Sequence, residues 1–306
     1  MEKAKFIWKD GEFVDWDKAE IHVLSHCLHY GSGVFEGIRA YQTDKGPAVF
    51  RLEEHAKRLM DSFSIFGIEP PYSQEEIEKA ILELMKKNGL GDAYIRPIIF
   101  FGRGQIGLKN LEKCNVNTVI AAGAWPKYLE GEAIKVKTTD IKRLSPKAFK
   151  VEAKVCGYYV NSILASREAA KDGYDEALML DQEGNVAEGP GENIFIVKDG
   201  KLFTPPSGAI LPGITRETII KIAKDKGYEI EEKELELEEV KDADEVFMVG
   251  TAAEVAPISK IDDKEIGVGE IAKELEETYE KVVRGKEKEY EDWLTYVNPE
   301  AEVKNG

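Results

Sequence analysis

Short apolar runs flank two Asp-Gly pairs, which predicts two β-hairpins. The apolar runs 6–8 and 13–16 flank an Asp-Gly pair at 10–11, and the same arrangement recurs around 199–200. An Asp-Gly pair between two apolar runs is a strong hairpin signal, because both residues tolerate the positive φ angles of a tight turn. We therefore expect antiparallel strand pairs at both places.

Apolar residues that recur every three or four positions predict helices. The clearest case is 73–88, where Ser73 and Glu76 fit a capping box and Gly89 fits a helix stop. Further helices are expected at 50–66, 160–171, 215–226 and 270–284, and strands at 94–101, 118–124, 134–139, 177–180, 193–197 and 245–249.

The order of these elements predicts an α+β protein of mixed α/β type with two domains. Strands and helices alternate without a Walker motif or a G-x-G-x-x-G motif, and several strands come as hairpins, which disfavours a doubly wound sheet. A length of 306 residues is natural for two domains. Since the composition shifts near residue 124, we predict a smaller N-terminal domain at 1–123, an interdomain linker loop at 124–133 and a larger C-terminal domain at 134–306.

Composition and charge narrow the class of partner. The hydrophobic fraction is 42% and the formal net charge is −16, so the chain can bury a core but is strongly acidic. Nucleic acid and anionic membrane surfaces require a basic face, and both are therefore disfavoured as partners. Small anionic ligands stay possible, because a few local donors can form a positive pocket in an acidic protein.

The cysteines and the apolar runs favour a cytoplasmic protein. The three cysteines lie far apart without a C-x-x-C motif, which disfavours a disulfide framework and a zinc ribbon. No signal peptide and no apolar run of membrane-spanning length is visible. His22, His26 and His29 match no metal-binding spacing, so no metal is expected and packing or hydrogen-bonding roles are favoured.

Two residues could react with or bind a cofactor. Lys154 is followed by four uncharged residues, and a lysine withdrawn from water holds its proton less firmly, so that its amine can bond to a carbonyl group. The alternative is a lysine whose side chain reaches solvent from a strand edge. Glu188, after a short strand, could pair with a protonated pyridine nitrogen or could be a solvated turn residue.

Other residues could bind anions. The segment 211–217 opens a helix, where free N–H groups bind phosphate, although Thr215 could also serve simply as the N-cap. The small residues at 250–253 would let a ligand approach the backbone. Arg58 is either a phosphate clamp or a surface residue. Arg96 lies in an apolar strand and needs either a structural carboxylate or a substrate carboxylate as partner.

Six motifs in a fixed order together resemble the branched-chain amino acid aminotransferases, which are fold type IV pyridoxal-phosphate enzymes. The resemblance covers about Phe6 to Val283. The motifs are Ser25-His26-Cys27-Leu28-His29-Tyr30-Gly31, Val34-Phe35-Glu36-Gly37-Ile38-Arg39, Tyr94-Ile95-Arg96-Pro97, Glu188-Gly189-Pro190-Gly191-Glu192-Asn193, Leu211-Pro212-Gly213-Ile214-Thr215-Arg216 and Gly250-Thr251-Ala252-Ala253-Glu254.

The resemblance implies a two-domain architecture with pyridoxal 5′-phosphate at the domain interface and the C-terminal domain as the cofactor-binding one. It implies that Lys154 carries the cofactor and transfers the proton, that Glu188 pairs with the pyridine nitrogen, and that Tyr159 hydrogen-bonds the phenolic oxygen. The cofactor is further implied to contact Leu211 and Gly250, and its phosphate to bind Arg58, Ile214, Thr215 and Thr251.

The resemblance also implies the substrate site and the assembly. The region that receives the substrate α-carboxylate is matched by Tyr94, Thr251 and Ala252. The pair that accepts the side-chain carboxylate of glutamate is matched by Arg96 and Tyr30. The apolar wall of the substrate pocket is matched by Phe35, Tyr128 and Tyr159, with Gly37 beside them. Since Tyr30 and the loop near Leu108 reach into the neighbouring subunit in this family, a homodimer is the minimum expected, and a hexamer stays open.

The implied reaction is a reversible ping-pong transfer of the amino group from L-leucine, L-isoleucine or L-valine to 2-oxoglutarate, with pyridoxamine phosphate as the intermediate cofactor form. The segment 155–158 is more apolar than is common in the family and the loop 104–108 is particular to this chain, which leaves the substrate range open. The alternatives are a D-amino acid aminotransferase or an aminodeoxychorismate lyase on the same fold, or a non-catalytic small-molecule binding protein.

Overall fold

The computed structural model describes residues 1–125 and 131–298, and its contacts group the chain into two compact units. The first unit comprises Met1–Pro126, Ala153–Gly157 and Val282–Gly306, and the second comprises Lys127–Glu152 and Tyr158–Lys281. Each unit has its own sheet with helices, which confirms the predicted α+β class with two domains. The units are not sequential, however, because the segments 153–157 and 282–298 belong with the N-terminal part rather than with the predicted domain 134–306.

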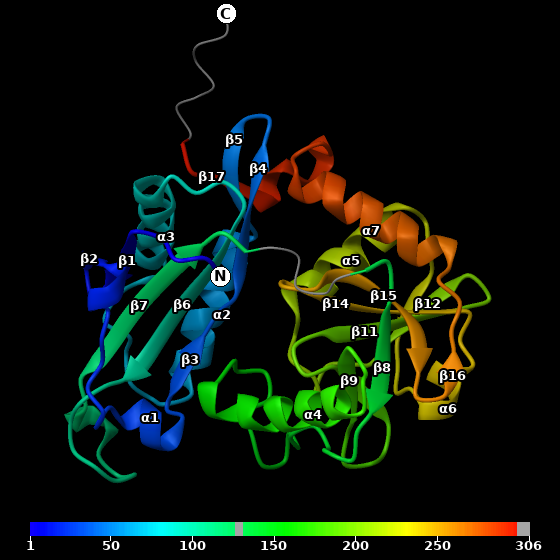
Figure 1. Cartoon of the computed structure of the whole chain (residues 1–306), viewed down its shortest axis with the longest axis horizontal. Helices are drawn as coiled ribbons and strands as arrows, with labels where there is room; N and C mark the ends of the chain where they lie inside the picture. Colours follow the sequence, from blue (N-terminus) through cyan, green and yellow to red (C-terminus); the bar gives the residue numbers. More distant parts are fainter. Residues whose placement is uncertain (126–130, 299–306) are drawn as a thin grey trace, which may run out of the picture. The chain divides into compact units, whose positions relative to one another are not determined.

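The first unit is built on an eight-stranded sheet with the order β17-β5-β4-β6-β7-β1-β2, in which β3 also pairs with β6 (Figure 1). Its strands are β1 Phe6–Lys9, β2 Glu12–Asp15, β3 Gly33–Phe35, β4 Ile38–Thr43, β5 Gly46–Phe50, β6 Ala93–Phe101, β7 Val116–Gly123 and β17 Leu294–Tyr296. All these pairs are antiparallel. The late strand β17 explains the grouping of the units, because it pairs with β5 across most of the chain length.

Helices α2 (Leu52–Ser64) and α3 (Gln74–Asn88) pack against each other and against this sheet. The capping box of α3 is present, since the Ser73 side chain accepts from the backbone N–H of Glu76 and the Glu76 side chain accepts from that of Ser73, and Gly89 ends the helix with a positive φ. The ring of Phe63 on α2 stacks on Phe101 of β6 at 5.4 Å, with both side chains fully buried. Burial of such a ring contributes about 1.5–3 kcal/mol. The short helix α1 (His26–Tyr30) precedes β3.

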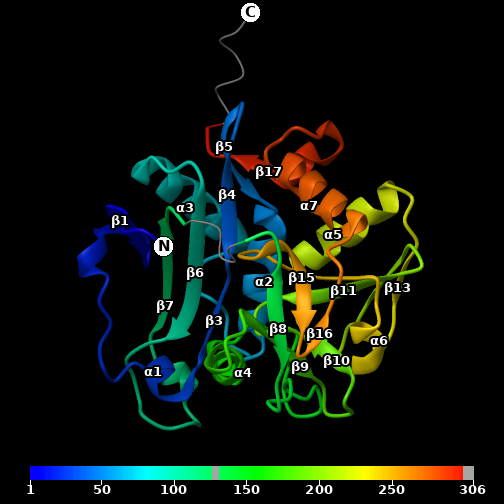
Figure 2. The same ribbon diagram turned by 45° about the vertical axis from the view of Figure 1, so that its right-hand side comes forward.

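The second unit contains a nine-stranded sheet with the order β10-β9-β8-β15-β14-β11-β12-β13, in which β16 also pairs with β15. Its strands are labelled in Figure 1 and Figure 2 taken together. Its strands are β8 Ile134–Thr138, β9 Glu176–Leu180, β10 Val186–Glu188, β11 Asn193–Lys198, β12 Lys201–Thr204, β13 Ile230–Glu232, β14 Glu245–Gly250, β15 Glu254–Ile261 and β16 Lys264–Glu265. Three pairs are parallel, namely β8 with β9, β8 with β15 and β12 with β13. The sheet is therefore mixed, as the sequence predicted.

The helices of this unit cover parts of the sheet. Helix α4 (Tyr159–Lys171) packs on β8 and β9, while α5 (Ile214–Asp225) packs on β13 and β14. Helices α6 (Leu237–Lys241) and α7 (Glu270–Val283) follow. Val240 of α6 belongs to the same buried cluster as Val136, Ile196 and Met248 of the strands.

The two predicted hairpins are β1–β2 and β11–β12, and all helices predicted from the 3.6-residue period are present within a few residues. The long strand β15 was not predicted, because Pro257 and the polar residues within it interrupt the strand pattern. Within the described part of the chain, none of the helices is both long and apolar enough to cross a membrane.

Candidate functional site

The backbone of Lys154 is held on both sides within the first unit. Its N–H donates to the hydroxyl of Ser62 on α2 at 3.0 Å, and its carbonyl accepts from the N–H of Phe35 on β3 at 3.1 Å. Val155 continues this contact as an isolated antiparallel bridge to Val34. The half-buried Lys154 side chain places its Nζ 5.2 Å from the centroid of the Phe35 ring. The segment is therefore fixed by a helix and a strand although it belongs to neither.

Two glycines allow the end of α1 to lie against this lysine segment. The N–H of Gly157 donates to the carbonyl of Gly31 at 3.1 Å. A Cβ on Gly31 would lie 2.5 Å from the Cα of Gly157, and Gly31 also has a positive φ of 65°. Any larger residue at Gly31 would therefore displace the backbone three residues after Lys154.

A buried ion network lies beside this segment. Arg58 of α2 donates from Nε to Oε1 of Glu36 at 2.6 Å and from Nη2 to Oε2 at 2.9 Å, which is a bidentate pair. Nδ1 of His55, one turn earlier on α2, lies 2.8 Å from Oε2 of the same carboxylate. Glu36 is fully buried, and the Arg58 side chain is 13% exposed. Arg58 is therefore not a surface arginine.

The charges in this network stabilise one another. Burial alone would raise the pKa of Glu36, but the neighbouring Arg58 and the hydrogen bond from His55 outweigh it and hold the pKa well below its ordinary range. Burial lowers the pKa of His55, and the nearby charges of Arg58 and Lys154 lower it further, although Glu36 opposes this. The network is thus an ionised Glu36–Arg58 pair with a neutral His55 at pH 7.

These shifts predict that acid destabilises the fold. For both His55 and Glu36 the folded pKa lies below the ordinary value, so the unfolded state binds more protons and stability falls as pH is lowered. For His55 the loss of stability begins near its ordinary pKa of 6.5 and grows as the pH is lowered from 7 to 5.5, because the unfolded histidine takes up a proton that the buried one does not. Urea unfolding at both pH values checks this, and His55→Gln should flatten the dependence. An equal slope in the variant would show that other groups cause the loss.

A second group of predicted residues gathers around the Phe35 ring. The guanidinium of Arg96 on β6 lies 4.7 Å from the centroid of this ring, and its Nη2 donates to the Tyr94 hydroxyl at 2.8 Å. Gly37 makes room for that hydroxyl, since a Cβ there would lie 2.0 Å from it. Phe35 thus carries two cations, Arg96 and Lys154, against its ring.

Among the described residues, the ring contacts of Tyr30 are with histidines and not with this group. Its ring is 44% exposed and lies 4.5 Å from the ring of His26 and 6.1 Å from that of His29. The histidines hydrogen-bond protein atoms: His26 contacts the Ser32 hydroxyl and the Gly107 carbonyl, and His29 contacts the Val23 carbonyl. Among residues 1–125 and 131–298, no group of three or more His, Cys, Asp or Glu side chains could hold a metal ion.

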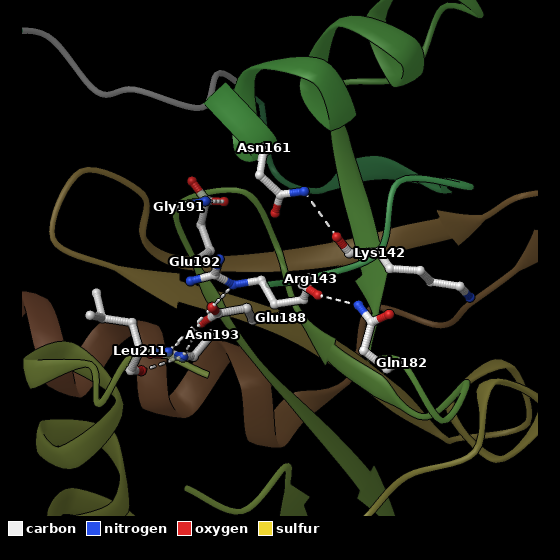
Figure 3. A network of polar contacts seen from close by, with 9 residues as sticks. All are labelled: Lys142, Arg143, Asn161, Gln182, Glu188, Gly191, Glu192, Asn193 and Leu211. Atoms are coloured by element: carbon white, nitrogen blue, oxygen red, sulfur yellow. Dashed lines mark hydrogen bonds and ion pairs between the residues drawn. The ribbon is translucent and has the colours of Figure 1, made fainter. Parts of the chain in front are cut away.

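In the second unit, Glu188 ends β10 and is only 4% exposed, which excludes a solvated turn residue. Figure 3 shows donors from Arg143, Asn193 and Leu211 around its carboxylate. Arg143 forms an ion pair with it, Nδ2 of Asn193 donates at 3.0 Å, and the backbone N–H of Leu211 donates at 3.2 Å. Nδ2 of Asn193 also donates to the Leu211 carbonyl at 3.1 Å, so the same network joins Glu188 to the loop before α5.

The beginning of α5 presents backbone donors. Gly213 is the N-cap, so Thr215 is the second residue of the helix and the alternative role of Thr215 as N-cap is wrong. The first N–H groups of a helix have no partner within the helix and, with the helix dipole, favour an anion. Ile214 and Thr215 are both buried. Gly213 must be a glycine here, because a Cβ would lie 1.9 Å from Oδ1 of Asn193.

The other predicted residues of the second unit lie at the ends of its elements. Gly250 is the last residue of β14, and Thr251 and Ala252 form the turn to β15. Tyr159 is the first residue of α4 and is half-buried. Tyr128, predicted as part of the substrate pocket, lies outside the described residues.

Sequence reasoning did not identify the residues that hold these groups in place, namely Glu36, Ser62 and Arg143. Arg143 stands in the largely polar stretch Lys142-Arg143-Leu144-Ser145, where a charged residue gives no signal that it is buried. Glu36 offered a signal that was not used, since it is the single charge within an apolar run, as Arg96 is in its strand.

Comparisons with known proteins agree on one family. The family model of amino-transferase class IV matches residues 33–261. The branched-chain-amino-acid aminotransferase of Pseudomonas aeruginosa is 46% identical over 298 residues, which cover 95% of this chain and 97% of that protein. The enzyme of the same name from Escherichia coli K12 is 42% identical over 304 residues, which cover 97% of this chain and 98% of that protein.

Solved structures give the same result for the fold. The branched-chain aminotransferase from the archaeon Thermoproteus uzoniensis, determined with norvaline, superposes with a TM-score of 0.94 at 46% identity and covers 96% of this chain and 100% of its own. The branched-chain amino acid aminotransferase from Thermobaculum terrenum, determined in its PLP-form, has a TM-score of 0.91 at 34% identity and covers 97% of this chain and 100% of its own.

Proposed function

Because the chain belongs to the amino-transferase class IV family, we propose that it catalyses the reversible ping-pong transfer of an amino group from L-leucine, L-isoleucine or L-valine to 2-oxoglutarate, with pyridoxal 5′-phosphate as cofactor. The observation that carries this proposal is the backbone attachment of Lys154 to Ser62 and Phe35, in a chain 46% identical over nearly its full length to a branched-chain-amino-acid aminotransferase.

The residues of the chain fit this cofactor. Glu188 is a buried carboxylate that can pair with a cationic ring nitrogen, and Arg58 and the start of α5 offer a cation and backbone donors for a phosphate. Lys154 supplies the amine. When bound, pyridoxal phosphate supplies an aldehyde for that amine and a ring that accepts the electron pair from the substrate Cα.

Lys154 has the central chemical role in this proposal. Its amine would hold the cofactor through the aldehyde and, with substrate bound, would act as the base that takes the proton from the substrate Cα and as the acid that returns it to the cofactor carbon C4′. This requires a lysine whose backbone stays in place while its side chain moves. The hydrogen bonds of Lys154 to Ser62 and Phe35 support such an arrangement.

Arg96 and Phe35 account for a pocket that accepts both apolar and acidic side chains. A carboxylate that enters an apolar pocket without a partner would cost several kcal/mol. Arg96 lies against the Phe35 ring and bonds the Tyr94 hydroxyl, so its charge is available beside an apolar wall. We propose that Phe35 contacts leucine-like side chains and that Arg96 binds the distal carboxylate of glutamate and 2-oxoglutarate.

We predict that Arg96→Leu discriminates between the two half-reactions. The variant should lose about 2–3 kcal/mol of transition-state binding for 2-oxoglutarate, which is a fall in kcat/KM of roughly 30- to 150-fold, and much less for leucine. Steady-state kinetics with each substrate varied in turn measures this. Equal losses for leucine and 2-oxoglutarate would contradict the role of Arg96.

The assembly proposed with this function is at least a homodimer. Helix α4 exposes Val160, Ile163 and Leu164 to more than half of their area, and these residues share one helix face at i, i+3 and i+4. In the first unit, apolar side chains are likewise exposed on and before α1 and in the loop that contacts His26: Ile21, Val23, Leu24, Leu28, Ile106 and Leu108. Such faces favour association with a second copy.

Light scattering of the purified protein tests the assembly. We expect a mass of at least two chains at micromolar concentration, and Ile163→Asp should shift it toward one chain, because a carboxylate would be buried without a partner in an apolar contact. A monomeric unmodified protein would exclude this proposal.

The decisive test of the function combines colour with substrate choice. We expect the purified protein to bind pyridoxal phosphate as a yellow complex that borohydride bleaches, and to form glutamate from L-leucine and 2-oxoglutarate. Activity with D-alanine but not L-leucine would indicate a D-amino acid aminotransferase, and release of pyruvate from aminodeoxychorismate a lyase. A colourless protein without transaminase activity would indicate a binding protein instead.

A further inference from the structure

Arg143 is a buried cation that the assigned site roles leave unexplained. It lies in an irregular segment after β8, and its side chain is only 10% exposed where it pairs with Glu188. Its backbone is fixed as well, because its N–H donates to the Leu180 carbonyl at 2.8 Å. Its carbonyl accepts from Nε2 of Gln182 at 2.8 Å (Figure 3). A guanidinium held in this way has a defined position relative to the carboxylate.

Arg143, Asn193 and Leu211, the three donors that the described residues offer to Glu188, differ in charge. Asn193 and the Leu211 backbone are neutral, whereas Arg143 carries a full positive charge that it does not lose at any working pH. All three favour the ionised carboxylate, but a charge in a buried site acts more strongly than a neutral dipole. Arg143 is therefore the donor among the three that most weakens the affinity of Glu188 for a proton.

We propose that Arg143 is a positioning residue that keeps Glu188 an ionised acceptor, so that the proton between Glu188 and the cofactor ring stays on the ring nitrogen. This rests on the proposed function, and it extends it to a residue outside the family motifs that marked the site. It assigns to Arg143 no contact with the reacting atoms.

The physical reason is the cost of buried charge. A carboxylate and a protonated pyridine that meet away from water can both become neutral if the proton moves from nitrogen to oxygen. The ring would then lose its positive nitrogen and accept the electron pair from the substrate Cα less well. The fixed charge of Arg143 opposes this transfer, because protonation of Glu188 would remove the anion that this buried arginine is paired with.

The test uses the holoenzyme loaded with cofactor that is ¹⁵N-labelled at the ring nitrogen. In the unmodified protein we expect the ¹⁵N chemical shift of a protonated pyridine at pH 7.5. In Arg143→Gln, which keeps donors but removes the charge, we expect the shift of a neutral pyridine, with kcat for leucine lower by about tenfold or more and a nearly unchanged KM. Arg143→Lys should restore the protonated shift.

Gln182→Ala is the matched control, because it removes the support of the Arg143 carbonyl and leaves the charge pair in place. It should keep the protonated shift. A protonated ring nitrogen in Arg143→Gln would overturn the proposal. A neutral nitrogen in the unmodified protein would also overturn it, so the test holds even if the glutamine variant fails to fold.

These outcomes separate the proposal from the function on which it rests. If the unmodified protein binds no cofactor and transfers no amino group, the proposed function fails. If it does both and the ring nitrogen stays protonated without the charge at position 143, only the role of Arg143 fails.

Discussion

Lys154→Ala is expected to abolish turnover with every amino acid tested and to remove the visible absorbance of the bound cofactor. The variant lacks both the amine that bonds to the cofactor and the group that moves the proton at Cα, and general acid–base catalysis alone contributes about 10²–10⁴-fold. A fall in kcat of about 10⁴-fold or more is therefore expected. Stopped assays of glutamate formation and an absorbance spectrum after dialysis measure the two effects.

Lys147→Ala is the control for this experiment. Lys147 also lies in the stretch before the lysine segment, but its side chain is 84% exposed, and its pairing with Glu183 is a surface contact of little energetic weight. This variant should keep its colour and activity. Retention of both properties by Lys154→Ala would refute the assignment of Lys154, whereas partial rescue of its activity by methylamine would support it.

The elements of the fold that depend on local signals could be predicted from the sequence. The Asp-Gly hairpins and the capping box of α3 each rest on residues within a few positions of one another, and all formed as predicted. What could not be predicted was long-range pairing. Strand β17 joins β5 near the other end of the chain, so the C-terminal residues belong with the first unit, and no local pattern indicates that partner.

The same distinction holds for the site. The residues proposed to react or to bind ligands lie in motifs that a family resemblance identifies. The resemblance did not identify the roles of the residues that fix them in position. Arg143 is 45 positions from Glu188, and Arg58 is 22 positions from Glu36, so each ion pair forms only in the folded chain. A lone charge in an apolar run was a usable signal for Glu36, whereas the polar surroundings of Arg143 concealed its burial.

The Arg58–Glu36 and Glu188–Arg143 pairs have the same physical basis. Each charge proposed to meet the cofactor already has a buried partner of opposite sign within its own unit: Arg58 has Glu36, and Glu188 has Arg143. The chain can therefore fold without the cofactor and without an uncompensated buried ion. The partners also hold each functional side chain in one orientation, so that little reorganisation accompanies cofactor binding.

This logic predicts a large loss of stability when only one partner is removed. Glu36→Leu would leave Arg58 in a largely buried position without its carboxylate, and breaking a buried pair in this way costs about 3–5 kcal/mol. Urea unfolding of the cofactor-free protein measures the loss without the stabilisation that a bound ligand adds. Asp61→Ala is the control on the same helix, because its pair with Lys57 is about two-thirds exposed and should contribute less than about 1 kcal/mol.

The double variant Glu36→Leu with Arg58→Met distinguishes a lost charge pair from a disrupted core. If Glu36→Leu lowers the free energy of unfolding because it leaves the Arg58 guanidinium buried without its carboxylate, removal of Arg58 as well should recover most of that loss. The reason is that apolar residues of similar size can replace a buried ion pair with little change in stability. The stable double variant should nevertheless bind pyridoxal phosphate poorly, because it lacks the Arg58 guanidinium that is proposed to bind the cofactor phosphate. If instead the double variant is less stable than either single variant, the two side chains act independently, and the buried pair is not what holds Arg58 in place.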